Sequence, residues 1–309
     1  MAVTVENLSK KYGSQVAVDN ISFTVNTGEV VGFLGPNGAG KSTTMKMITC
    51  FIAPASGDVR LDQFSIHEDA EEIKKRIGYL PENNPLYTDM PVIEYLQFCG
   101  EVQGMAKGEI STRMHEMIEK CGLDTEKHKK INELSKGYRQ RVGLAQAMIH
   151  DPEVLILDEP TSGLDPNQIV EIRNLIKELG KEKTVILSSH ILSEVEATCD
   201  RIIIINNGRI VADGTSLSLR QQAQGQELLN IEIEAEADYD NVLEELTGLA
   251  SVETARKRNG QEGKFRIQSK PDKSSRKAVF DLCVKNKWYL TEMTAIETKL
   301  EDVFRELTN

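Results

Sequence analysis

The residues from Gly35 to Thr43 could hold a polyphosphate. Their order, Gly-Pro-Asn-Gly-Ala-Gly-Lys-Ser-Thr, fulfils the fixed positions of a G-x-x-x-x-G-K-[ST] pattern. They follow the apolar run Val30–Leu34, which predicts a strand, and they lead into a helix that we expect to begin at Lys41. A strand, a glycine-rich turn and a helix N-terminus direct successive backbone N–H groups to one point, where a polyphosphate can bind. The sequence therefore predicts a phosphate-binding loop.

Each residue type in this loop has a separate task. Gly35, Gly38 and Gly40 permit backbone angles and close approaches that a Cβ atom would block. Lys41 is predicted to place a positive charge on the β- and γ-phosphates, and the Ser42 hydroxyl is placed to bind a magnesium ion. Asn37 and Thr43 complete the predicted nucleotide-binding set in this loop.

Two carboxylates follow the apolar run Val154–Leu157 and form a second candidate group. A continuous apolar run is typical of a strand inside a parallel sheet, and ligands of open α/β sheets bind at the carboxyl ends of such strands. Asp158 is placed to organise the magnesium ion, and Glu159 to polarise a water for attack on the γ-phosphate. The alternative is that the two acids only cap a strand at the surface.

His190 follows a third buried strand, Thr184–Leu187, and is predicted to lie level with the two carboxylates. A histidine at this edge could sense a γ-phosphate through a hydrogen bond, although a single histidine is usually structural. Of the five histidines, only His190 has this placement.

Two further candidates are weaker when judged from the residues alone. The ring of Tyr12 could stack on a nucleotide base, or it could be an ordinary turn tyrosine beside Gly13. Ser135 and Gly137 precede a helix predicted from about Arg139 to Ile149 and could bind a phosphate. A serine at that position is also a common N-cap.

The elements that must position these residues predict an α/β core. Alternating residues at Val3–Leu8 and Ile21–Val25 indicate a β-rich layer at the N-terminus, and residues 85–150 read as an inserted helical subdomain. A polar, glutamine-rich stretch near residues 215–226 suggests a linker helix. We therefore predict a first domain over residues 1–220 and a C-terminal α+β domain, in the order βαββαβ, over residues 221–309.

The composition narrows the possible functions. The net charge of −11 argues against a protein that binds nucleic acid through many phosphate contacts. The five cysteines form no C-x-x-C pair, so neither a disulfide framework nor a zinc site is expected. The longest apolar runs are far shorter than the roughly 20 residues that span a bilayer, so we expect any membrane role to act through a partner.

Taken together, these motifs resemble the ATP-binding subunits of ABC transporters, from Val3 to about Gly214. In that resemblance Gly35–Thr43 is similar to the Walker A motif, Val154–Glu159 to Walker B, Leu134–Tyr138 to the signature sequence, Ser162–Asp165 to the D-loop, His190 to the switch histidine and Tyr12 to the adenine-stacking aromatic residue. The resemblance implies a P-loop NTPase fold with a parallel-sheet core that binds ATP and Mg²⁺ and hydrolyses ATP.

The resemblance also implies partners. Ser135 and Gly137 of a second copy, with Asp165 of the D-loop nearby, would complete each ATP site. With one set of motifs in the chain we expect a dimer of two identical chains. An integral membrane permease would be the other partner, which implies a cytoplasmic chain peripheral at the inner face of the cell membrane.

Two motifs depart from the common family pattern, at three positions. Lys136 and Tyr138 replace a glycine and a glutamine of the signature, and Glu82 stands at the Q-loop glutamine, where a carboxylate can reach a metal-bound water. These departures and the C-terminal domain resemble the ABC-2 export group. Ile77–Tyr87 and Leu134–Leu144 look closer still to gliding-motility-associated subunits.

Two other function classes remain as alternatives. A soluble ABC ATPase acting on ribosomes or nucleic acid usually has two motif sets, or a long coiled coil between the Walker motifs, and this chain has neither. A regulatory nucleotide-binding module would not need Glu159. We therefore expect an ATPase that powers an ABC-2-type transporter, with no nucleic-acid partner.

Overall fold

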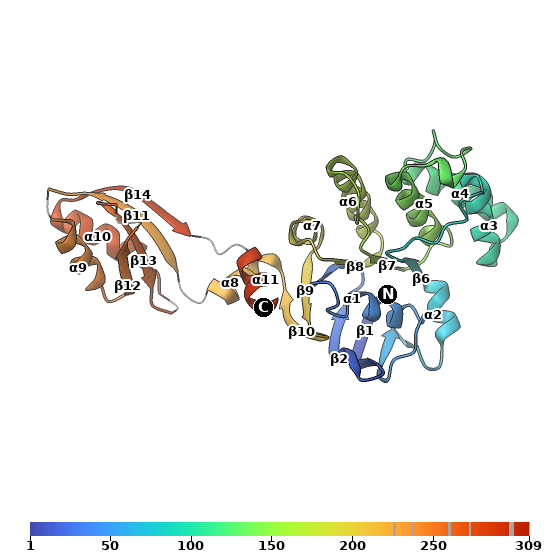
Figure 1. The fold of residues 1–309 in the computed structure, drawn as a ribbon, viewed down its shortest axis with the longest axis horizontal. Coiled ribbons are helices and arrows are strands. Elements are labelled where there is room, and N and C mark those ends of the chain that lie inside the picture. Colours follow the sequence, from blue (N-terminus) through green and yellow to red (C-terminus); the bar gives the residue numbers. More distant parts are fainter. Residues whose placement is uncertain (225–226, 237, 259–260, 272, 297–299, 309) are drawn as a thin grey trace. The chain divides into compact units, whose positions relative to one another are not determined.

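The computed structural model describes residues 1–309 apart from 225–226, 237, 259–260, 272, 297–299 and 309. The chain divides into two compact units (Figure 1). The larger unit consists of Met1–Ser216 with Glu306–Asn309, and the smaller unit of Leu217–Arg305. Among the helices that the structure describes, none combines the length and the hydropathy needed to cross a bilayer.

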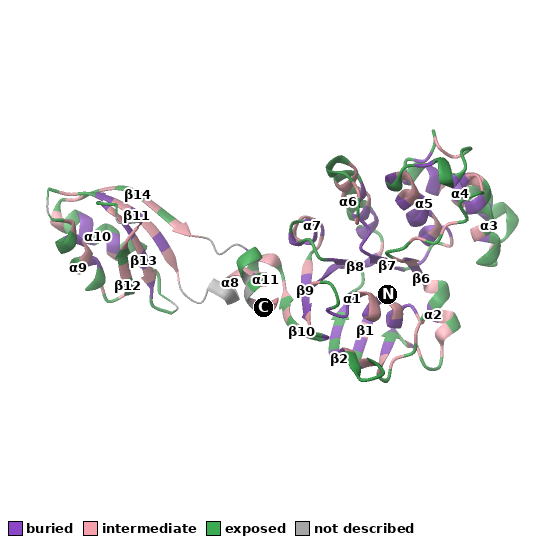
Figure 2. Ribbon diagram, viewed as in Figure 1, coloured by how far each residue is buried: buried purple, intermediate pink, exposed green. Residues whose placement is uncertain are grey.

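A six-stranded, mostly parallel sheet forms the centre of the larger unit. Its strands are, in spatial order, β10 (Arg209–Gly214), β9 (Arg201–Asn206), β3 (Val30–Leu34), β8 (Thr184–Ser189), β7 (Val154–Asp158) and β6 (Ile77–Leu80). Among the pairs that the structure describes in this sheet, β9–β10 is antiparallel and the others are parallel. Every residue of β3, β7 and β8 is buried (Figure 2), which agrees with their unbroken apolar runs.

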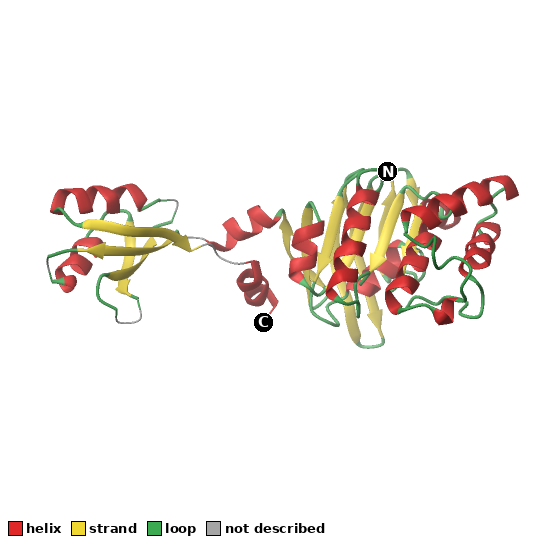
Figure 3. Ribbon diagram, turned by 90° about the horizontal axis from the view of Figure 1, so that it is seen from above, coloured by secondary structure: helices red, strands yellow, loops and turns green. Residues whose placement is uncertain are grey.

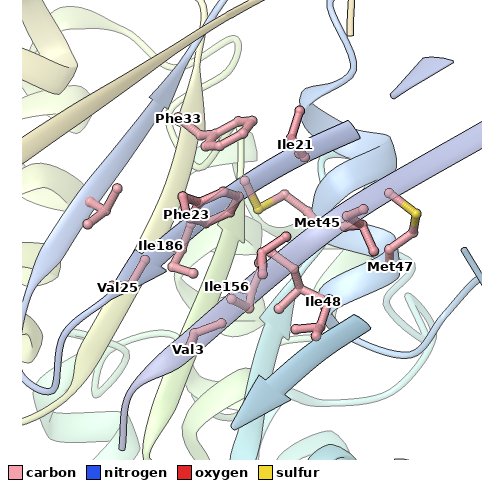
Figure 4. Close-up of a cluster of buried hydrophobic side chains, with 14 of the residues drawn as sticks. Val3, Ile21, Phe23, Val25, Phe33, Met45, Met47, Ile48, Ile156 and Ile186 are labelled. Carbon is pink, nitrogen blue, oxygen red and sulfur yellow. The ribbon is translucent and has the colours of Figure 1, made fainter. Parts of the chain in front are cut away.

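A second, antiparallel sheet makes the β-rich layer predicted for the N-terminus. It is built from β2 (Gln15–Val25), β1 (Val3–Tyr12), β4 (Ser56–Leu61) and β5 (Phe64–Ser65), in that order. The core between the two sheets includes Phe23 and Phe33, whose ring centroids lie 5.4 Å apart, and Met45 and Ile48 of the first helix (Figure 4).

Helices surround the sheets of the larger unit (Figure 3). They are α1 (Lys41–Ile48), α2 (Ala70–Arg76), α3 (Val92–Val102), α4 (Lys107–Lys120), α5 (Lys136–Met148), α6 (Pro166–Gly180) and α7 (Leu192–Thr198), with a 3-10 turn at Ile131–Glu133. The next helix, α8 (Ser216–Gln224), belongs to the smaller unit from its second residue onward. Helices α3, α4 and α5 lie in the chain between β6 and β7, as the predicted helical insertion requires. The predicted α/β class with a parallel-sheet core is confirmed.

The smaller unit has the predicted order βαββαβ. Its elements are β11 (Leu228–Glu234), α9 (Tyr239–Thr247), β12 (Val252–Lys257), β13 (Lys264–Ser269), α10 (Arg276–Asn286) and β14 (Tyr289–Ile296), followed by α11 (Leu300–Thr308). The sheet order is β12-β13-β11-β14, and all its pairs are antiparallel. Alternate strand residues such as Ile231 and Phe265 are buried in one core with residues of α9 and α10.

The structure corrects several predicted boundaries. Helix α5 begins at Lys136 rather than near Arg139, because the Ser135 side chain caps it by accepting a hydrogen bond from the Tyr138 N–H. The sequence did not predict the short helices α2 and α7 or the strands β4 and β5, whose apolar patterns are too brief to show a period.

Candidate active site

A cleft of about 510 Å³ lies at the carboxyl edge of the central sheet, where β3 leads into α1. Its lining consists of residues from five separate stretches of the chain: Tyr12, Gln15, Ala17, Asn37, Gly38, Gly40, Lys41, Ser42, Thr43, Glu82, Glu159, Ser162 and His190. Most of the residues predicted from the sequence therefore meet in one cavity.

The loop before α1 takes a conformation that only glycine supports well. Gly38 and Gly40 have φ angles of 80° and 110°, in the left-handed region. A Cβ atom on Gly40 would also lie 2.5 Å from the Ala17 carbonyl oxygen, and one on Gly35 would lie 2.4 Å from the Ile205 carbonyl oxygen. Among the residues that the structure describes, no side chain caps the start of α1, so its first N–H groups are available as donors for an anion.

Lys41 lies between the phosphate-binding loop and Glu159, the candidate catalytic carboxylate. Its Nζ atom donates to the Gly35 carbonyl oxygen at 2.8 Å and lies 3.4 Å from Oε1 of Glu159. The side chain is buried, with 6% of its surface exposed. A buried ammonium beside several backbone N–H groups makes this end of the cleft strongly attractive to phosphate oxygens.

Asp158 sits behind the loop and is joined to it through Ser42. The Ser42 Oγ donates to Oδ1 of Asp158 at 3.1 Å, and the Ser188 Oγ donates to the same oxygen at 2.5 Å. Hydroxyl and carboxylate oxygens are the hard ligands that Mg²⁺ prefers, and it commonly takes only one or two of them from the protein and the rest from phosphate and water. The residues present therefore fit a magnesium ion.

Glu159 is fixed at its backbone and at both carboxylate oxygens. Its φ angle of 50° is left-handed, and its N–H donates to the Ser188 Oγ at 3.0 Å. Oε1 faces Lys41, while Oε2 lies 2.8 Å from Nδ1 of His190. A carboxylate held in this way lines the cleft in a fixed direction, as a general base requires.

The remaining predicted residues of the cleft lie at its rim. Tyr12 is half exposed, and the Lys10 ammonium lies 5.5 Å from its ring centroid. Its open ring face is available for stacking on a planar base. Glu82 is exposed and also lines the neighbouring cavity that contains Lys136.

Besides Gly35 and Asp158, whose contacts with the loop are given above, three more predicted residues are not among the described residues that line this cleft. Ser135 caps α5, and Asp165 caps α6 by accepting hydrogen bonds from the N–H groups of Asn167 and Gln168. Gly137 is packed beneath α6, because a Cβ atom there would lie 2.6 Å from Cδ of Gln168. The signature segment and the D-loop helix of one chain are therefore in contact.

Ser188 is a site residue whose role the sequence did not reveal. Its hydroxyl accepts from the Glu159 N–H and donates to Asp158, so one buried group fixes both acids. The strand pairing explains this role, because β7 and β8 pair in parallel with Asp158 opposite Ser188. That pairing partner becomes known only with the sheet.

The chain is similar to known ATP-binding proteins. A family model described as ABC transporter matches residues 18–162, and a second one described as an AAA domain matches residues 129–196. The chain is 34% identical over 307 residues to the uncharacterized ABC transporter ATP-binding protein YxlF of Bacillus subtilis (strain 168), covering 99% of each chain. It is 39% identical over 217 residues to a Nod factor export ATP-binding protein I of Ralstonia nicotianae, covering 69% of this chain and 66% of the relative.

Solved structures agree with these relatives. A dimeric ATP-binding cassette in a post-hydrolysis state with bound ADP and Pi superposes with a TM-score of 0.63 and 28% identity, over 69% of this chain and 98% of that chain. The shared part corresponds in extent to the larger unit, which carries the cleft.

Proposed function

This chain belongs to the family of ABC transporter ATP-binding proteins, and we propose that it powers an ABC-2-type exporter as its ATP-hydrolysing subunit. Family membership makes it an ATP-binding transport ATPase, in agreement with the post-hydrolysis state of its structural neighbour. The name of the Nod factor export relative supports the further step to an exporter. The smaller unit, whose βαββαβ order accompanies the ABC-2 resemblance, supports the same group.

The observation that carries the proposed reaction is the position of Glu159 between Lys41 and His190. Lys41 and the loop N–H groups bind the β- and γ-phosphates and hold the γ-phosphorus in front of Glu159. Glu159 takes a proton from a water whose oxygen bonds to the γ-phosphorus, while the bond from that phosphorus to the bridging oxygen breaks. His190 orients the water and the γ-phosphate.

Mg²⁺ is part of this proposal. Ser42 and Asp158 would hold the ion, which would neutralise negative charge on the phosphate oxygens. The Tyr12 ring would stack on the adenine, and Glu82, which also lines the cleft, would reach a water bound to the ion.

We propose that two identical chains form the working unit. Ser135, Gly137 and Asp165 lie outside the described lining of the cleft in their own chain, and a single set of motifs is present. A second copy would supply its signature helix start to the γ-phosphate. The structural neighbour with ADP and Pi is dimeric, which supports this arrangement.

The proposed membrane partner is a permease, and an apolar groove on the larger unit supports its docking. The groove is lined by exposed aromatic and aliphatic side chains that include Phe51, Tyr87, Phe98 and Val102. Exposed apolar groups gathered in one groove are typical of a protein contact, and a helix of the permease's cytoplasmic face is the occupant we propose. The chain would then lie peripherally at the inner face of the cell membrane.

The two units have different proposed tasks. We propose that residues 1–220 bind and hydrolyse ATP and that residues 221–309 form an accessory domain. The finer resemblance to gliding-motility-associated subunits, carried by Ile77–Tyr87 and Leu134–Leu144, stays a prediction that the identity of the permease will decide.

The test is a purification of tagged Glu159→Gln protein from its native membranes in Mg-ATP, with mass spectrometry of the chains that come with it. We expect a polytopic membrane protein, and we expect Phe51→Ser to remove it. The control is Phe280→Ser, which changes an exposed phenylalanine of the smaller unit and should keep the partner. Recovery of ribosomal or other soluble partners alone would favour the soluble-ATPase alternative instead.

A further inference from the structure

Glu194 is a buried acid on α7 that the proposed reaction does not use. Its exposed fraction is 9%, and no ion pair joins it to a basic side chain in the part of the chain that the structure describes. A buried carboxylate is costly unless other groups satisfy it. Its hydrogen-bond partners therefore show what holds it there.

Of the two described partners of the Glu194 carboxylate, one lies in the loop after β7, and the other is the last residue of β8 and leads into the loop that carries His190. Its Oε2 accepts a hydrogen bond from the Thr161 Oγ1 at 2.5 Å and another from the Ser189 Oγ at 3.3 Å. The Ser189 Oγ in turn accepts from the Ile191 N–H at 3.0 Å, so its proton points to Glu194. All three side chains are buried.

These loops carry the two groups that must act together on the γ-phosphate. Thr161 is two residues beyond Glu159 and leads into the D-loop, whereas Ser189 is next to His190. One oxygen of Glu194 therefore connects the segment that carries Glu159 with the segment that carries His190, and these two residues are 2.8 Å apart.

We propose that Glu194 is a positioning residue for ATP hydrolysis. It keeps the loop after β7 and the loop after β8 at a fixed separation, so that Glu159 and His190 address the same water and phosphate. This inference rests on the proposed roles of Glu159 and His190. Because Glu194 is not among the described residues that line the cleft, it acts on hydrolysis and not on nucleotide binding.

The test compares kcat with the dissociation constant for ATP in purified full-length variants. Glu194→Ala is expected to lower kcat by about 10- to 100-fold and to leave the ATP dissociation constant unchanged. Glu194→Gln retains an acceptor oxygen and should recover most of kcat. The control is Thr198→Val, which removes a buried hydroxyl that donates to the Glu194 backbone oxygen and not to either loop, and should keep kcat.

A mutant cycle separates positioning from general stability. In the wild-type protein, Thr161→Val and Ser189→Ala should each lower kcat. In the Glu194→Ala variant neither change should lower kcat further, because the acceptor that both hydroxyls share is gone. The proposal would be overturned if Thr161→Val and Ser189→Ala lowered kcat as much in the Glu194→Ala variant as in the wild-type protein. It would also be overturned if Glu194→Ala had the kcat of the wild-type protein. If Glu194→Ala does not fold, the Thr161→Val/Ser189→Ala pair decides: non-additive losses of kcat support the inference and additive losses overturn it.

The roles on which the inference rests are checked separately with Glu159→Gln. If that variant still hydrolyses ATP at the natural rate, the proposed function of the site fails. If it loses hydrolysis while Glu194→Ala keeps it, only the positioning role fails.

Discussion

Replacing Ser188 by alanine is the most informative perturbation of the site. The hydroxyl is fully buried, donates to Asp158 and accepts from the Glu159 N–H. Alanine removes both hydrogen bonds without adding volume. The backbone of Glu159, which has an unfavourable left-handed φ angle of 50°, then loses a contact that fixes it.

The expected magnitudes follow from these two bonds. A hydrogen bond to a charged group contributes about 1.5–3 kcal/mol, and an N–H left buried without a partner costs about 1–3 kcal/mol. Because these contributions overlap, we expect Ser188→Ala to lower the free energy of unfolding by about 2–4 kcal/mol. Small displacements of reacting groups can lower rates by up to about 100-fold, so kcat should fall by about 10- to 100-fold.

Thr184→Val is the matched control, because Thr184 lies on the same strand at its other end. Its buried hydroxyl also makes two hydrogen bonds, from the Gly28 N–H and to the Met1 carbonyl oxygen. We expect a loss of stability of about 1–3 kcal/mol and an unchanged kcat. Urea unfolding and steady-state phosphate release measure the two quantities. If Ser188→Ala loses stability but keeps kcat, as the control does, the hydroxyl does not organise the catalytic acids.

Three other changes test separate parts of the structure. Tyr12→Ala should raise the KM for ATP by about 5- to 100-fold, since stacking on a base contributes about 1–3 kcal/mol. Tyr12→Phe keeps the ring and should leave the KM unchanged. If both variants raise the KM equally, stacking is excluded. Gly78→Ala should lower the unfolding free energy by about 1–3 kcal/mol in urea unfolding, because its Cβ would lie 2.1 Å from the Ala147 carbonyl oxygen. Partial burial holds the pKa of His150 below its ordinary value of 6.5. As the pH falls, this histidine is therefore protonated at a higher pH in the unfolded chain than in the folded chain. The unfolding free energy should then decrease as the pH falls through about 6.5, and less so in His150→Gln.

The phosphate-binding loop and the buried strands could be predicted from the sequence because their signals are local. Gly35–Ser42 must satisfy backbone angles and close approaches within a few residues, and the run Val154–Leu157 must be buried on both faces. The short elements α2, α7, β4 and β5 could not be predicted. Packing against the rest of the fold stabilises them, and they are too short to show a period of their own.

Distances between side chains far apart in the sequence were beyond sequence reasoning. Glu159 and His190 were predicted to lie at one edge, and the structure brings them to 2.8 Å. The roles of Ser188 and Glu194 were not predicted, since serine and glutamate near strand ends are common and usually exposed.

The sequence by itself determined which chemical groups this protein has and in which order they occur along the chain. The glycines, Lys41 and Ser42 are recognisable because a phosphate-binding turn constrains neighbouring residues directly. The acids at the end of β7 are recognisable because they follow an unbroken apolar run. Only the tertiary structure decided how these groups are held. The parallel pairing of β7 with β8 sets Ser188 opposite Asp158, and the packing of α7 brings Glu194 to Thr161, 33 residues away in the chain. Such pairings depend on strand order and helix packing, which no short stretch of sequence encodes.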